Sequence, residues 1–146
     1  MKTFKRHFMT IVFMLLCIGI NADDLITSQI TIKLDKAGTL PNIIGDSRKY
    51  KITNLKLIGD INGDDVKLIR DMAGRDCDGR VTSGNLSTLD LSEANIVKGG
   101  YYYDRYFIEH NNEIGSYFFC KCKRLTSIVL PSSITSIGDW AFYDCI

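Results

Sequence analysis

One stretch decides the fold: residues 114–145, which read IGSYFFCKCKRLTSIVLPSSITSIGDWAFYDC. Four positions in it recur 23 residues later, where Ile114, Gly115, Phe119 and Cys122 return as Ile137, Gly138, Phe142 and Cys145. Between the two copies lies an L-x-x-I-x-L run made of Leu125, Ile128 and Leu130 and closed by a proline. A period in the twenties with such a run predicts a leucine-rich-repeat solenoid, in which each repeat adds one strand to a parallel sheet.

The same apolar spacing occurs twice more upstream, in the runs Ile52-x-x-Leu55-x-Leu57 and Leu86-x-x-Leu89-x-Leu91. Alternate side chains of a strand share a face, so the spaced apolar residues mark the side that turns toward the core. We therefore expect an α/β fold with three parallel strands in one sheet and short helices or turns on the return side.

Residues 23–97 are expected to form an N-terminal α/β cap that contains the first strands. Ile30 to Leu34 alternates apolar and polar residues and predicts a short strand. Residues 64–73 predict an amphipathic helix capped by Asp64. Its core face is expected to hold Val66, Ile69, Met72 and Ala73, and its solvent face Lys67, Arg70 and Asp71.

The N-terminus has the layout of a secretory signal peptide. Three basic residues precede an apolar run from Phe8 to Ile20, and Asn21 and Ala22 follow. Cleavage after Ala22 would remove residues 1–22 and leave a secreted or cell-surface protein without a transmembrane span. The alternatives are a membrane anchor, for which the run is short of about 20 residues, and lipidation at Cys17, which the leucines before it disfavour.

The charge pattern excludes a nucleic-acid binder. The chain holds 18 basic and 17 acidic side chains, and the expected signal peptide contains three of the basic ones and none of the acidic ones. The remaining chain is therefore slightly acidic, with charges of both signs intermixed, as on an ordinary solvated surface.

Four cysteines remain after processing, namely Cys77, Cys120, Cys122 and Cys145. Cys122 and Cys145 occupy equivalent repeat positions. Neighbouring strands of a parallel stack lie about 4.8 Å apart, a separation that permits a disulfide. Small buried thiols also pack well at such positions, and we expect free thiols there.

Together these residues resemble the bacterial surface leucine-rich repeat proteins of the BspA (Bacteroides surface protein A) type. The resemblance is carried by Ile114-Gly115, Phe119, Cys122, Leu125-Thr-Ser-Ile128, Leu130-Pro131, Ile134-Thr-Ser-Ile137-Gly138, Ala141-Phe142 and Cys145, about one and a half repeats. It implies a secreted or cell-surface, non-catalytic binding solenoid, with a host matrix protein or a microbial surface protein as partner.

Residues 114–146 are expected to be the repeats, in an array that is truncated where the next L-x-x-I-x-L run is due. A solenoid needs a polar cap at each end, so the open C-terminal edge is expected to promote self-association. The alternative to a binding module is a structural or remnant fragment of a longer repeat protein with no ligand of its own. Repeats downstream of Ile146 would favour the binding module.

Patterns for metal or catalytic chemistry are weak. Asp60 to Asp65 begins like a calcium loop, but Asp65 stands where that loop needs glycine. One residue separates Cys120 from Cys122, whereas structural zinc sites prefer two to four. His110 has no nucleophile motif near it. We expect no enzyme, no metal and no cofactor, and a secreted hydrolase remains only because fold does not fix function.

The best candidate ligand-binding site is a tyrosine-rich insertion loop, residues 98–113. It contains Tyr101, Tyr102, Tyr103, Tyr106 and Phe107. Tyrosine combines a large contact area with a polar tip, which suits protein interfaces. The alternative is that two or three of these rings fold over an open edge of the core.

Overall fold

The computed structural model describes residues 24–145. The expected signal peptide, residues 1–22, lies outside the described residues.

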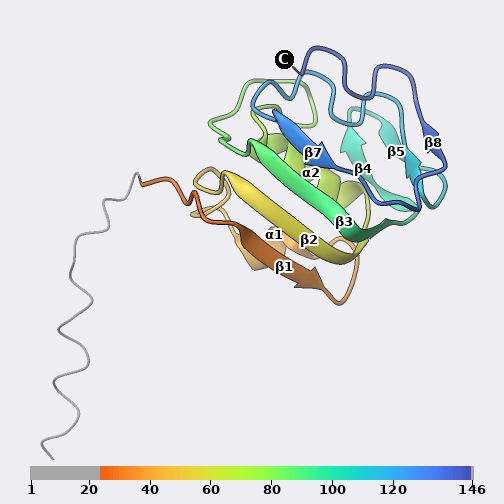
Figure 1. Ribbon diagram of the computed structural model, residues 1–146. Helices are drawn as coiled ribbons and strands as arrows, with labels where there is room; N and C mark the ends of the chain where they lie inside the picture. Colours follow the sequence, from red (N-terminus) through yellow and green to blue (C-terminus); the bar gives the residue numbers. More distant parts are fainter. Residues whose placement is uncertain (1–23, 146) are drawn as a thin grey trace, which may run out of the picture.

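A parallel sheet of four strands organises the molecule (Figure 1). Its order is β1 (Ile30–Leu34), β2 (Asn54–Ile61), β3 (Thr88–Ile96) and β7 (Ser127–Val129). The register sets Leu55 opposite Leu89, and Leu89 opposite Ile128. The prediction that the three apolar runs form parallel strands of one sheet is therefore confirmed, and β1 adds a fourth strand beside β2.

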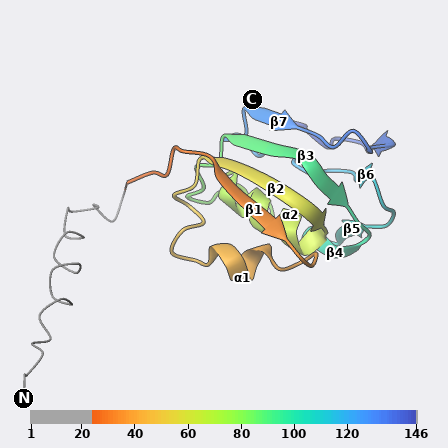
Figure 2. The same cartoon turned by 60° about the horizontal axis from the view of Figure 1, so that its bottom comes forward.

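Two helices, α1 (Leu40–Ile44) and α2 (Gly63–Met72), pack together beneath this sheet (Figure 2). Leu55 and Leu57 on β2 and Ile69 on α2 are fully buried. The expected core face of α2 is confirmed, because Val66, Met72 and Ala73 are fully buried as well. An α/β fold with a parallel sheet and few short helices follows from these contacts.

The N-cap of α2 differs from the prediction. Asn62, not Asp64, is the cap: its side-chain oxygen accepts a hydrogen bond from the Asp64 backbone N–H at 3.0 Å. The carboxylate of Asp65 accepts one from the Asn62 backbone N–H, also at 3.0 Å, which completes a capping box. Asn62 is extended and can turn its oxygen toward the first helical turn, whereas Asp64 already lies inside the helix and is exposed.

Arg70 also corrects the prediction, since it is fully buried instead of facing water. Its Nη1 donates to the carbonyl oxygens of Tyr117 and Phe118 at 3.0 and 2.9 Å, and its Nη2 to that of Cys120 at 3.3 Å. Its guanidinium lies 4.4 Å from the centre of the Tyr103 ring. Arg70 therefore ties α2 to the first turn of the repeat stretch.

The 23-residue period is visible in the backbone of the repeat stretch. β6 (Glu113–Ile114) pairs in parallel with β8 (Ser136–Ile137), with Ile114 opposite Ile137. Beyond them, the N–H groups of Phe119 and Lys121 donate to the carbonyls of Ala141 and Tyr143, each at 2.7 Å. Equivalent turns of successive copies thus lie side by side.

The expected insertion loop is an ordered antiparallel hairpin. β4 (Gly99–Tyr103) pairs with β5 (Tyr106–Ile108), and β4 packs against α2. The approach is close: a Cβ atom on Gly63, the first residue of α2, would collide with the carbonyl of Gly100. Glycine at both positions allows the hairpin to dock directly on the N-terminal end of the helix.

Candidate functional site

The hairpin separates the five predicted aromatic residues into an inner and an outer set. Tyr102 is only 1% exposed, whereas Tyr101, Phe107 and Tyr106 are 59%, 46% and 36% exposed. Successive side chains of a strand point to opposite faces. One ring therefore folds into the core, while Tyr101, Tyr106 and Phe107 stay exposed.

Tyr102 belongs to the core. Its ring centre lies 4.8 Å from that of Phe118, and its hydroxyl donates to the carbonyl of Ser116 at 2.9 Å. Gly115 makes room for it, because a Cβ there would strike the Tyr102 hydroxyl. Burial raises the pKa of Tyr102 to about 12, and the negative charges of Glu113 and Glu109 add to the effect.

The outer face of the hairpin is made by Tyr101 and Phe107. Their rings meet edge to face, with centres 5.8 Å apart. Such pairs hold each other in place, with about 0.5–1.5 kcal/mol of attraction beyond their buried area. This pair is held by two paired strands and presents a rigid apolar surface to solvent.

Tyr103 and Tyr106 continue the aromatic surface toward the hairpin turn. Each also contacts Tyr117 from the repeat stretch, with ring centres 6.0 and 5.2 Å away. Tyr103 is half-buried between this neighbour and Arg70. The sequence prediction missed Tyr117, since it lies outside the tyrosine-rich segment and only folding brings it there.

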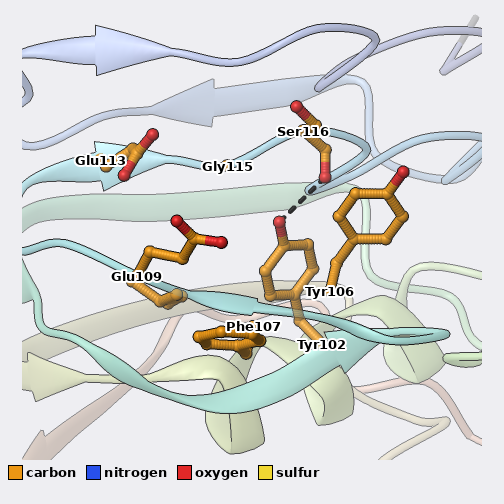
Figure 3. Close-up of a pocket in the computed structure, with 8 residues that line it drawn as sticks. Tyr102, Tyr106, Phe107, Glu109, Glu113, Gly115 and Ser116 are labelled. Carbon is orange, nitrogen blue, oxygen red and sulfur yellow. Dashed lines mark hydrogen bonds between the residues drawn. The ribbon is translucent and has the colours of Figure 1, made fainter.

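A pocket of about 190 Å³ opens beside the hairpin (Figure 3). Its aromatic lining includes Tyr106 and Phe107, and its acidic lining is Glu109 and Glu113 (Figure 3). The remaining lining includes Tyr102, Ile108, Gly115 and Ser116. The carboxylate of Glu109 points toward the Tyr102 ring, and Glu113 lies farther along the lining, on the same strand as Gly115 (Figure 3).

The two glutamates were not predicted as site residues. Among the described residues, Glu113 has one possible ion-pair partner, His110, whose Nδ1 lies 3.1 Å from its Oε2. Single acids in a polar segment carry no periodic or motif signal, so nothing in the sequence distinguishes them. Pairing β6 with β8 and docking the hairpin bring them to one cavity.

Size and composition limit what this pocket can hold. Pockets for drug-sized ligands and cofactors usually enclose about 300–1,000 Å³, so this one suits a single amino-acid side chain. Across residues 24–145, no three side chains of the metal-binding types converge. In the calcium-like segment, Asn62 and Asp65 are already engaged in the capping box of α2.

The cysteines are free thiols, as expected. Cys122 is fully buried and Cys145 is 9% exposed. The Cys145 Sγ lies 3.0 Å from the carbonyl oxygen of Phe119. Burial raises the pKa of the Cys122 thiol to about 12, which keeps it protonated and unreactive in the folded chain.

The predicted repeat positions differ in burial. Ile114, Phe119, Cys122 and Leu125 are buried, Ile128, Leu130 and Phe142 are partly buried and pack on the core, and Ile137 is 56% exposed. Val129, Trp140 and Tyr143 are each about half exposed nearby in sequence. The final turn therefore carries a second apolar surface.

Comparison with known proteins identifies the repeat stretch. The family described as "BspA type Leucine rich repeat region (6 copies)" matches residues 105–146. No curated protein matches the chain significantly. Within the described part of the chain, no helix combines the length and the apolar character needed to cross a membrane.

The match fits the geometry, because the 23-residue pairing of β6 with β8 and the strand β7 both lie inside residues 105–146. Members of this family are generally non-catalytic repeat modules that act in protein interaction and are typically found at the surface or secreted. Residues 105–146 are a leucine-rich repeat region of the BspA type.

Proposed function

We propose that the chain is an exported protein-binding module, secreted or held at the cell surface, and that the outer face of hairpin β4–β5 contacts its partner. The exposed pair of Tyr101 and Phe107 carries this proposal. Aromatic side chains are enriched in the centres of protein interfaces, where they bury much area at little entropic cost. A microbial surface protein or a host matrix protein would be the partner.

Rigidity supports the choice of the hairpin. β4 is paired with β5 and packed on α2, and Tyr102 anchors it in the core. The contact residues are therefore already ordered before binding, and preorganised side chains forfeit less entropy on association.

The proposed organisation keeps the boundaries expected from the sequence. Residues 1–22 are a signal peptide, residues 23–97 a cap with the first strands, residues 98–113 the aromatic insertion, and residues 114–146 repeats of a solenoid. The mass of the exported protein tests the first boundary, since cleavage after Ala22 gives a chain that starts at Asp23. Full-length protein in the membrane fraction would contradict it.

The last turn favours a second candidate function, a scaffold that associates through its repeat edge. Trp140 and Tyr143 form an exposed edge-to-face pair with ring centres 4.8 Å apart, and Ile137 is exposed beside them in sequence. If this edge mediates self-association, sedimentation should show a concentration-dependent dimer that Trp140→Ser weakens. The hairpin variants should not affect that dimer.

Site-specific photo-crosslinking tests the proposed function. A benzoylphenylalanine placed at Tyr101 or at Phe107 should crosslink to the same protein from a preparation of surface or matrix proteins. The matched control position is Ile43 on α1, whose exposure of 46% equals that of Phe107. Crosslinks from Ile43 that equal those from the hairpin would contradict the proposal, as would capture that a Tyr101→Ser, Phe107→Ser double variant does not reduce.

A further inference from the structure

We propose that the pocket between hairpin β4–β5 and strand β6 receives a lysine or arginine side chain of the partner protein. The inference rests on the proposed function, because it names the chemistry by which the partner is anchored. Four lining residues carry it: Tyr106, Phe107, Glu109 and Glu113.

The walls of the pocket match the two parts of such a side chain. The rings of Tyr106 and Phe107 offer apolar surface for the aliphatic stem and a negative π face for the charged end. The carboxylates of Glu109 and Glu113 provide acceptors for charge-assisted hydrogen bonds to an ammonium or a guanidinium. A carboxylate or phosphate group would meet repulsion from both glutamates.

The charge of the pocket is not neutralised by the chain itself. Some acids elsewhere on the surface pair with a lysine, as Asp71 does with Lys49 at 3.0 Å and Asp144 with Lys123 at 3.0 Å. Among residues 24–145, Glu109 has no ion-pair partner, and that of Glu113 is His110 alone. The pocket therefore holds negative charge that a partner's cation would complement.

The position of the pocket ties it to the proposed contact surface. Phe107 is both a wall of the pocket and half of the exposed pair with Tyr101. A basic side chain seated in the pocket would be flanked by aromatic rings that exclude water, which is the arrangement found around energetically dominant interface residues. The pocket volume of about 190 Å³ suits a side chain and is too small for most cofactors. Two carboxylates without a third ligand among the described residues make a poor metal site.

Titration of the full chain with single-residue probes tests the assignment. The probes are N-acetyl-arginine methylamide and N-acetyl-lysine methylamide, and the neutral controls are the citrulline and norleucine analogues. In NMR spectra, we expect the two cationic probes to shift the resonances of Phe107, Glu109 and Glu113, with a Kd at least tenfold lower than that of the neutral analogues. Equal binding of the neutral analogues, or no shift with either cationic probe, would overturn the proposal.

Variants that remove the carboxylates of Glu109 and Glu113 test whether these two charges bind the cationic probe. The E109Q/E113Q pair should raise the Kd of the arginine probe at least tenfold, whereas E93Q, which removes an exposed carboxylate of β3 that pairs with Lys56, should leave it unchanged. Amide spectra that retain the wild-type pattern outside the pocket would show that the variants fold. Unchanged affinity in E109Q/E113Q would overturn the proposal, and so would calcium chloride that gives the same shifts at a lower concentration than the probe.

The two proposals fail separately. If the hairpin crosslinks to a partner but the cationic probes do not bind, the protein-binding function stands and the cation pocket is wrong. If the probes bind but neither hairpin position crosslinks, the proposed function is wrong, and the assignment of the cation to a protein partner is overturned with it.

Discussion

The N-terminal region (residues 24–97) and the repeat region (residues 105–145) contribute to one parallel sheet but close their cores differently. In the N-terminal region α2 covers the sheet, and Leu55, Leu57 and Ile69 are fully buried. The repeat region has short strands and turns over its core, and Ile137 and Trp140 are each 56% exposed. A helix completes a core locally, whereas repeat turns depend on what is stacked against them.

The largest loss of stability should come from substituting Arg70, the residue that joins the two regions. Arg70→Ala leaves the buried carbonyls of Phe118 and Cys120 without this donor, and a cavity beside Tyr103. Each buried unsatisfied group costs about 1–3 kcal/mol, so we expect the free energy of unfolding in urea to fall by about 4 kcal/mol. Lys67→Ala, on the exposed side of the same helix, is the control. A loss below about 1 kcal/mol for Arg70→Ala would show that the two regions are not joined in this way.

Two side-chain truncations, one in each region, compare the packing of the N-terminal core with that of the repeat region. Leu57→Ala in β2 should cost about 2–5 kcal/mol, as for other fully buried leucines. Ile137→Ala in β8 should change the stability by no more than about 0.5 kcal/mol, because its side chain is already more than half exposed. Urea unfolding of both variants measures the difference. Equal losses would mean that the edge of the repeat region is covered in solution.

Alkaline pH should destabilise the repeat region through Cys122. Its pKa rises from 9.0 to about 12 because burial penalises the thiolate. The native thiol therefore binds its proton more tightly than the unfolded one, so its contribution is complete below pH 9 and is lost as the pH rises toward 12. At pH 11 the loss should be about 2–3 kcal/mol.

Cys122→Ala should flatten this part of the pH dependence when unfolding is measured between pH 8 and 11. The raised pKa of Tyr102 gives a further loss in the same direction above pH 10, which the Cys122 variant should retain. A slope that is identical in the wild type and the variant would contradict the burial of this thiol.

The smallest loss of stability is expected from substitutions that compare the two candidate N-caps of α2. Asn62→Ala should reduce stability by about 1 kcal/mol, because the Asp64 backbone N–H loses its acceptor. Asp64→Ala should cost only a few tenths, from the lost favourable charge in the first turn. Thermal melts of the two variants decide between them, and a larger effect at Asp64 would restore the cap predicted from the sequence.

The strands were predictable because their signal is local and repeated. Leu55, Leu89 and Ile128 occupy the same position in three runs, and the register pairs them in one sheet. The match between Ile114 and Ile137 likewise appears both in the sequence and in the backbone. Periodicity of this kind follows from strand geometry and does not depend on distant contacts.

Other features escaped prediction because their partners are distant in the chain. Arg70 has the periodic position of a solvent-facing residue, and only the carbonyls of residues 117–120 make its burial favourable. Glu109 and Glu113 line the same pocket because the hairpin docks beside β6. The segment from Gly99 to Ile108 has no clear alternation of apolar and polar residues, since aromatic side chains lie on both faces of the hairpin.

The central claim is that the hairpin buries the Tyr102 ring in the core and exposes an aromatic face on its other side. Tyrosine nitration tests this claim most directly. Brief treatment of the folded full chain with tetranitromethane, followed by peptide mass spectrometry, reports the accessibility of each ring. We expect Tyr101 to react quickly, Tyr106 more slowly, and Tyr102 only after unfolding, in keeping with exposures of 59%, 36% and 1%. Rapid nitration of Tyr102 in the folded chain would show that the hairpin is not docked on α2, and the proposed binding face would lose its support.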